Sequence, residues 1–195
     1  IMTAGRGINN LKGRLFIIGA IGIIPAGLVY VISSNLSSSI IIFLIVFFMM
    51  FIAFINGMPN GNINVWYAII AAWGTDIFAY FIGKHFGKHK FTQISPNKSI
   101  EGCVGGILGA VVAILIYTFV CNNVFNMSIN YFYAIFISIL LSCISQIGDL
   151  AASSIKRYCG IKDYSNLIPG HGGMLDRIDS VIFVLPFAYF LLMII

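Results

Sequence analysis

The residues best suited to chemistry lie in the segment 145–179. Asp149, Ser153, Lys156 and Arg157 occur at i, i+4, i+7 and i+8, so on a helix they share one face. That face carries a carboxylate, a hydroxyl and two cations. Carboxylates can hold a hard cation such as Mg²⁺, and Lys and Arg can neutralise phosphate oxygens. The spacing therefore predicts a site for a phosphorylated substrate.

The end of this segment adds a second acidic pair and a glycine-rich turn. Asp176 and Asp179 are at i and i+3 at the start of the last apolar run, where a helix N-terminus favours negative charge. Backbone N–H groups of the turn 169–173 can approach phosphate oxygens closely. His171 in this turn could donate a hydrogen bond or act in acid–base chemistry, and a structural role is an equal alternative. The alternative is an ordinary juxtamembrane loop with positive-inside charge and helix-capping aspartates, which explains Lys156 and Arg157. The four acidic residues near membrane depth favour a functional site instead.

A second group of candidates surrounds residues 76–101. Asp76 is a charged residue inside an apolar run, which indicates function, with an interhelical polar contact as the alternative. The basic segment 83–88 is expected to form a glycine-rich loop. Lys98 lies in a turn between Ser95 and Ser99 and is a candidate phosphate ligand. His85 and His89 have a metal-binding spacing, but no third ligand is near them, and this disfavours a metal site.

The composition shows which elements must position these residues. The chain has 195 residues, of which 59% are hydrophobic, and its 11 basic and 6 acidic residues make up only 9%. Soluble domains carry about 25% charged residues, so a water-soluble globule is excluded. Disorder is excluded because apolar residues dominate the chain. The basic residues lie in loops between apolar runs, where membrane topology explains them better than nucleic acid binding. The four cysteines lack the CxxC spacing of a zinc site.

We expect an all-α integral membrane protein, a polytopic bundle of about six transmembrane helices with a polar cavity facing the cytoplasm. The candidate spans are 15–32, 40–55, 64–82, 104–121, 131–148 and 181–195. Two spans separate the two charged loops, which therefore share a side, and the positive-inside rule places that side in the cytoplasm. The basic N-terminus then falls on the opposite side. A re-entrant early run, a miscounted span or sequence upstream of residue 1 would each resolve this conflict.

Residues 66–195 resemble the phosphatidate cytidylyltransferases, also called CDP-diacylglycerol synthases. The C-terminal motif of that family matches without a gap at Ser153, Lys156, Arg157, Lys162, Asp163, Pro169, His171, Gly172, Gly173, Asp176, Arg177 and Asp179. Further matching segments are 145–150, 76–83, 86–88, 95–98 and 101–106. A match this long is poorly explained by chance.

The resemblance implies an enzyme that joins CTP and phosphatidate to give CDP-diacylglycerol and pyrophosphate. It implies a bacterial inner (cytoplasmic) membrane location, with the active site facing the cytoplasm. Asp149 and Asp176 would hold Mg²⁺ in a paired-cation centre, for which a monovalent cation such as K⁺ is a candidate. Phosphate contacts would come from Lys156, Arg157, Lys162 and Arg177. Asp163 and Asp179 would support the site. The substrate-binding site would be lined by Asp76, Lys98, Ser95, Ser153, His171, Gly172 and Gly173.

The resemblance also suggests a division of the chain. Residues 1–65 would form N-terminal membrane helices, shortened relative to the family, and residues 66–195 the catalytic membrane domain. Partners would be CTP, phosphatidate and membrane lipids, without nucleic acid, and a homodimer is compatible with this picture. The alternatives are a related CTP-dependent lipid enzyme (a prenol or dolichol kinase, or an archaeal-type CDP-lipid synthase), a transporter or channel, and an inactive truncated scaffold.

Overall fold

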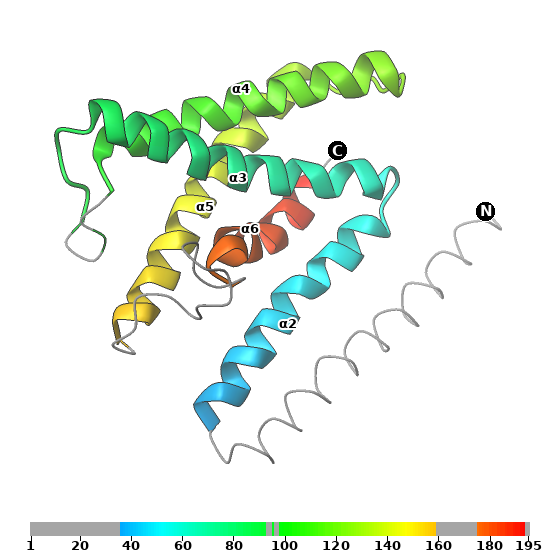
Figure 1. The fold of residues 1–195 in the computed structure, drawn as a ribbon. Helices are drawn as coiled ribbons and strands as arrows, with labels where there is room; N and C mark the ends of the chain where they lie inside the picture. Colours follow the sequence, from blue (N-terminus) through cyan, green and yellow to red (C-terminus); the bar gives the residue numbers. More distant parts are fainter. Residues whose placement is uncertain (1–35, 93–94, 96–97, 159–174, 194–195) are drawn as a thin grey trace. The chain divides into compact units, whose positions relative to one another are not determined.

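The structure is a computed structural model that describes residues 36–92, 95, 98–158 and 175–193. Side chains are described from residue 46 in α2 and from residue 179 in α6. The helices of this part (Figure 1) are α2 (Leu36–Asn56), α3 (Gly61–Phe86), α4 (Ile100–Val124), α5 (Tyr131–Tyr158) and α6 (Leu175–Leu192). The only β pairing among the described residues is an isolated antiparallel bridge between Lys90 and Ser99.

The prediction of an all-α membrane protein is confirmed for the described residues. Three described helices, α3, α4 and α5, are long and apolar enough to cross a bilayer. Shorter apolar stretches are found at Val46–Asn56 and Asp179–Leu192. The later candidate spans fall within or overlap α2 to α6, whereas the candidate span 15–32 lies outside the described residues. The number of six spans therefore stays a prediction.

The chain divides into two compact units, residues 1–62 and residues 63–195. In the first unit, Phe51 packs edge-on against Phe47 and Phe54, with ring centroids 5.7 and 5.4 Å apart. Helix α2 ends at Asn56, as the sequence predicts. The turn that follows contains Asn60 with a left-handed φ of 57°, which asparagine tolerates better than most residues.

In the second unit, each helix reverses the direction of the one before it. Near the end of α3, Ala79 lies against Gly102 at the start of α4, whereas Tyr67 near the start of α3 bonds Thr118 near the end of α4. Helix α5 packs against both α4 and α6. The C-terminal parts of α3 and α5 therefore meet the N-terminal parts of α4 and α6. We call this the charged end, because it carries the acidic and basic residues discussed below.

Glycines allow the helices to approach closely at this end. A Cβ atom on Gly106 would lie 2.9 Å from the Thr75 carbonyl oxygen, and one on Gly148 would lie 2.5 Å from Phe183 Cβ. Small residues permit such close backbone approach between membrane helices. Within a bilayer, helices associate mainly through van der Waals contact, because the hydrophobic effect does not drive them together. The α3–α4 and α5–α6 contacts thus depend on residues without a side chain.

The predicted loop at 83–88 is wrong for residues 83–86, because α3 continues through Phe86. Gly83 packs against the start of α4, where an added Cβ would lie 3.5 Å from Gly102 Cα. It therefore serves helix packing rather than helix termination. Lys84 and His85 occupy the last turn of α3, where the negative end of the helix dipole favours basic residues.

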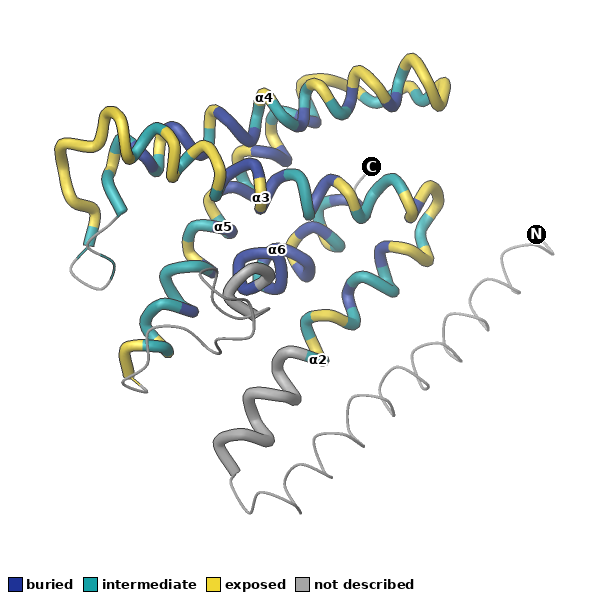
Figure 2. The backbone as a smooth tube through the Cα atoms, viewed as in Figure 1, coloured by how far each residue is buried: buried dark blue, intermediate teal, exposed yellow. Residues whose placement is uncertain are grey.

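Burial separates the helices into inner and outer surfaces. Figure 2 shows buried residues along most of α6 and exposed ones recurring along α4. The exposed residues on α4 include Val104, Leu108, Val112 and Ile116, spaced four residues apart on one face. Large apolar side chains exposed at this spacing are expected where a helix faces lipid.

Candidate active site

A cleft of about 860 Å³ opens at the charged end of the second unit. Its wall is formed by helices α3, α4, α5 and α6 and by the segment between α3 and α4, residues 87–99, which we call the α3–α4 connector. Its ionisable lining residues are Asp76, Tyr80, Lys84, Lys98, Cys103, Asp149 and Asp179. Trp73, Ile77 and Phe91 add an apolar part to the same wall. The cleft thus offers charged and apolar surface together, as a lipid phosphate would require.

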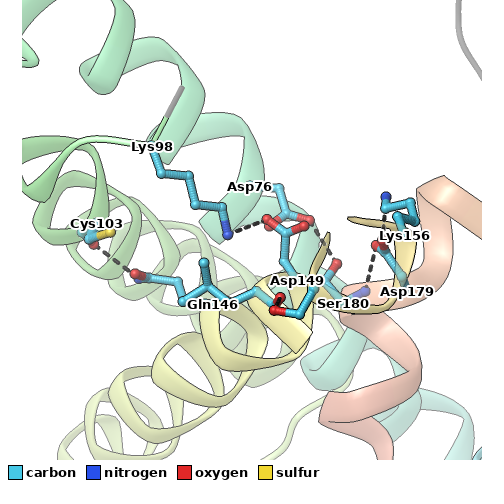
Figure 3. Close-up of polar contacts among 10 residues, drawn as sticks. Asp76, Lys98, Cys103, Gln146, Asp149, Lys156, Asp179 and Ser180 are labelled. Carbon is cyan, nitrogen blue, oxygen red and sulfur yellow. Dashed lines mark hydrogen bonds and ion pairs between the residues drawn. The ribbon is translucent and has the colours of Figure 1, made fainter. Parts of the chain in front are cut away.

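The shortest ion pair among the described residues joins the connector to α5. Lys98 Nζ lies 2.5 Å from Asp149 Oδ2, and the two side chains are 23% and 30% exposed. Figure 3 shows the Lys98 side chain extended toward the carboxylates of Asp149 and Asp76. An ion pair that is open to the cleft can exchange partners, because each group remains accessible to an incoming phosphate or cation. Lys98 is therefore a candidate phosphate ligand, as the turn at 95–99 predicts.

Asp76 is held from α6 by a neutral partner. The Ser180 hydroxyl donates to Asp76 Oδ2 at 2.7 Å, and the Ser180 backbone N–H donates to Asp179 Oδ1 at 2.8 Å. One buried serine therefore bonds two carboxylates that line the cleft. A hydroxyl donor satisfies a carboxylate lone pair but brings no positive charge. The negative charge of Asp76 is thus left available to a cation in the cleft.

The third acidic residue of the cleft is paired by a lysine of α5. Lys156 Nζ lies 3.6 Å from Asp179 Oδ2, and both side chains are about nine-tenths buried, at 12% and 10% exposed. Helix α5 continues to Tyr158, so Asp149 and Lys156 lie on one helix, as predicted. The two residues nevertheless face different partners, on the connector and on α6.

Sequence reasoning missed two polar residues at this end. Ser180 was overlooked because a serine at the start of an apolar run resembles ordinary helix composition. Gln146 matched the family motif but was not assigned a role. Its side chain donates from Nε2 to the Cys103 carbonyl oxygen at 3.0 Å, which ties α5 to α4 one turn before Asp149. A polar residue one turn from a charged one was the available signal for Gln146.

Several predicted site residues are not brought into the cleft by the described structure. Ser153 is half-buried and Arg157 is exposed, and neither is among the described lining residues. Ser95 does line the cleft. Residues outside the described part are Lys162, Asp163, His171, Gly172 and Gly173. Asp176 and Arg177 lie in the first turn of α6, but their side chains are not described.

The two histidines near the connector have separate partners. His85 Nδ1 lies 2.9 Å from the Phe81 carbonyl oxygen, and His89 Nδ1 lies 2.6 Å from Glu101 Oε1. Among the described residues, no group of three or more His, Cys, Asp or Glu side chains could hold a metal ion. Magnesium is commonly bound by one or two carboxylates together with substrate phosphates. The accessible Asp149 carboxylate fits that mode of binding, which needs no all-protein cage.

Comparison with known proteins assigns the chain to a family. The sequence model of the cytidylyltransferase family matches residues 4–195. The chain belongs to the cytidylyltransferase family. The resemblance inferred from the motifs is thereby confirmed, and the family match extends upstream of residue 66, where that resemblance begins.

Similar curated members of the cytidylyltransferase family are phosphatidate cytidylyltransferases. The protein of Bacillus subtilis (strain 168) is 47% identical over 133 residues, which cover 68% of this chain and 48% of that protein. The proteins of Staphylococcus haemolyticus (strain JCSC1435) and Staphylococcus aureus (strain COL) are each 41% identical over 143 residues, or 73% of this chain and 54% of theirs. The chain thus spans about half the length of the curated relatives it matches.

Proposed function

We propose that this protein transfers a cytidylyl group from CTP to phosphatidate, giving CDP-diacylglycerol and pyrophosphate. The names of its relatives support the two substrates. The observation that carries the proposal is the accessible Lys98–Asp149 pair, 2.5 Å apart, in a cleft with both charged and apolar walls. A nucleotide triphosphate needs cations and a metal-binding carboxylate, whereas a diacylglycerol phosphate also needs apolar surface beside them.

The reaction requires positioning and charge neutralisation rather than a covalent enzyme intermediate. A phosphate oxygen of phosphatidate attacks the α-phosphorus of CTP, and a new P–O bond forms. The bond from that phosphorus to the oxygen that bridges to the β-phosphorus breaks, and pyrophosphate leaves with the electron pair. Lys98 would turn from Asp149 to a phosphate oxygen, while Asp179 holds Lys156 beside the cleft.

The remaining site residues enter this proposal through the family motif. Basic groups for the nucleotide phosphates would be supplied by Arg157, Lys162 and Arg177. Asp163 would support them. Hydroxyl, imidazole and backbone contacts to the substrates would be supplied by Ser95, Ser153, His171, Gly172 and Gly173. Asp76 would line the same site, where Ser180 fixes its carboxylate.

Asp149 and Asp176 would hold Mg²⁺, and a monovalent cation such as K⁺ is a candidate for the second position. The hard carboxylate oxygens and the accessibility of Asp149 support this assignment. Bound Mg²⁺ would offset negative charge on the nucleotide phosphates and so favour attack at the α-phosphorus. Asp149 belongs to α5 and Asp176 to the first turn of α6, so the proposed ligands come from two helices of the second unit.

We propose that the charged end faces the cytoplasm of a bacterial inner membrane, in a bundle of about six spans. Lys88, Lys90 and Arg157 are exposed at this end, and basic residues favour the cytoplasmic side. A Lys90→Cys variant, with the native cysteines replaced by alanine, should react with a membrane-impermeant maleimide only when the cytoplasmic face is accessible. Labelling of intact cells from outside would contradict this orientation.

The homodimer stays a prediction that light scattering in detergent tests.

Turnover by purified protein in detergent tests the function directly. With CTP labelled at the α-phosphate, phosphatidate and Mg²⁺, we expect labelled CDP-diacylglycerol and an equal amount of pyrophosphate. Asp149→Asn should lower the rate by about a hundredfold or more, the scale for losing a preorganised electrostatic group. Its size-exclusion profile and helical circular dichroism should stay unchanged. A fully active Asp149→Asn protein, or product formed only from a prenol phosphate, would overturn the proposal.

A further inference from the structure

We propose that Glu101 is a positioning residue, which sets the place of Lys98 in the cleft by fastening the α3–α4 connector through His89. This inference rests on the proposed function, because Lys98 is taken to serve the phosphates of that reaction. Glu101 itself does not line the cleft among its described residues. Its effect on the reaction would be transmitted through the backbone that carries Lys98.

The connector is a paired strap rather than an open loop. The Phe91 N–H donates to the Lys98 carbonyl oxygen at 2.8 Å, and the Ile100 N–H donates to the His89 carbonyl oxygen at 3.0 Å. Between these bonds, Lys90 and Ser99 form the isolated antiparallel bridge. The outgoing arm, residues 89–91, is thus joined along its length to the returning arm, residues 98–100. The position of either arm fixes the position of the other.

Glu101 ties the outgoing arm to the first turn of α4. Its Oε1 atom lies 2.6 Å from His89 Nδ1, and the His89 backbone N–H points to both carboxylate oxygens at 3.3 Å. The start of α4 is itself fixed, since the Ser99 hydroxyl accepts from the Gly102 N–H at 3.1 Å. An acidic residue in the first turn of a helix is also favoured by the helix dipole. Glu101 therefore anchors the strap to a rigid element.

The consequence for Lys98 follows from the nature of its side chain. A lysine places a point charge on a flexible four-carbon stem, so the position of its ammonium depends on where its backbone is held. The Lys98 N–H donates to the Ser95 carbonyl oxygen at 3.0 Å, and its own carbonyl accepts from Phe91. Its ammonium then reaches Asp149 on a different helix. Releasing the outgoing arm would let this ammonium sample more positions.

A purely stabilising role explains the contact between Glu101 and His89, which we call the clamp, less well. The His89 side chain is 74% exposed, and exposed ion pairs contribute little to stability. Glu101 nonetheless accepts from both the ring and the backbone of one residue. These two bonds fix the position of His89 relative to the start of α4. That position matters because Lys98, on the paired arm of the connector, must contact a substrate.

A double-mutant cycle tests whether Glu101 acts through Lys98. We expect Glu101→Ala to lower kcat/KM about tenfold, a loss in the range for a misplaced catalytic contact. Glu101→Gln keeps an acceptor oxygen and should recover part of that loss. In the Lys98→Ala background, Glu101→Ala should cause no further loss. An equal loss in both backgrounds, or no loss in either, would overturn the proposal, because independent effects add.

Amide hydrogen exchange gives a readout that does not depend on turnover. Glu101→Ala and His89→Ala should speed exchange of amides in 89–100 and leave those of 140–150 in α5 unchanged. His85→Ala is the matched control, because its imidazole bonds the Phe81 carbonyl of its own helix and should leave the strap protected. Wild-type protein that exchanges as expected but does not use CTP and phosphatidate would defeat the proposed function alone. Unchanged exchange in both clamp variants would defeat the positioning role.

Discussion

The two ends of the helices in the second unit use polar residues in different ways. The charged end joins acids to lysines and to Ser180 around a cleft. At the other end, neutral hydroxyls bond one another or backbone carbonyls: Tyr67 to Thr118 at 2.9 Å, Tyr117 to the Ile63 carbonyl at 3.0 Å, and Tyr133 to the Leu191 carbonyl. We call this the hydroxyl end.

The difference indicates that one end of the bundle stabilises the fold and the other end carries the reactive groups. A hydroxyl pair can satisfy a donor and an acceptor without charge, so it can be buried in an apolar bundle at modest cost. Ionised groups are costly at membrane depth and are found where a substrate, an ion or a paired charge requires them. The hydroxyl end therefore holds the helices together, and the charged end is the part expected to act on substrates. Variants at the two ends should separate these contributions.

The largest expected effect is on activity at the charged end. Lys98→Ala removes the ammonium 2.5 Å from Asp149 and should lower turnover of CTP and phosphatidate by about a hundredfold, as for other electrostatic contacts to a transition state. Lys88→Ala, an exposed lysine at the start of the connector, is the matched control and should retain activity. Equal losses in the two variants would show that general positive charge, rather than the Lys98 contact, matters.

Ser180→Ala should affect both activity and stability. It removes the donor to the part-buried Asp76 carboxylate, and a hydrogen bond to a charged group contributes about 2 kcal/mol. We expect a lower thermal unfolding midpoint in detergent and reduced turnover. Ser154→Ala is the control, because that hydroxyl donates only to the Leu150 carbonyl of its own helix among its described partners. A Ser180→Ala protein with unchanged activity would remove Asp76 from the site.

At the hydroxyl end, stability should fall while activity is kept. Tyr67→Phe removes one partner of the buried Thr118 hydroxyl and should cost about 1 kcal/mol of unfolding free energy. Tyr131→Phe, at a more exposed tyrosine, should change the unfolding midpoint less. Specific activity at a temperature well below unfolding should match the wild type for both. A loss of specific activity in Tyr67→Phe would break the proposed separation of the two ends.

The smallest effect is expected on the exposed face of α4. Leu108→Ala should change the unfolding free energy by less than about 0.5 kcal/mol, as exposed substitutions usually do. Ile114→Ala, fully buried on the same helix, should lower it by about 2 kcal/mol or more. Thermal unfolding of the two variants in one detergent measures the contrast. Strong destabilisation by Leu108→Ala would indicate that this face is covered by protein.

The sequence was informative where a residue's type and its helical spacing were enough. The apolar runs predicted the helices, the spacing of Asp149 and Lys156 placed both on α5, and Asp76 was singled out by its apolar neighbours. Pairings across helices could not be predicted, because they depend on how closely the helices approach. The Lys98–Asp149 contact is one example. Another is the bond from Ser180 of α6 to Asp76 of α3, two residues that lie 104 positions apart in the sequence.

The loop predicted from Gly83 onward shows a second limit of sequence-based prediction. In sequence, a glycine followed by basic residues reads as a loop, because glycine commonly follows a helix end. In the fold, that glycine lies against Gly102, and the helix continues to Phe86. The same residue type serves a turn or a close contact, and only the neighbouring helix decides between them.

The hydrogen bond from Ser180 to Asp76 also bears on biosynthesis. The two residues are 104 positions apart, so at a synthesis rate of about 5–20 residues per second Asp76 is made roughly 5 to 20 seconds before its donor. During that interval α3 carries a carboxylate that has yet to meet this partner. The nascent chain must keep it hydrated, or hold it within the insertion machinery, until α6 arrives. The cleft is therefore completed late in synthesis, after the hairpin of α3 and α4 has been made.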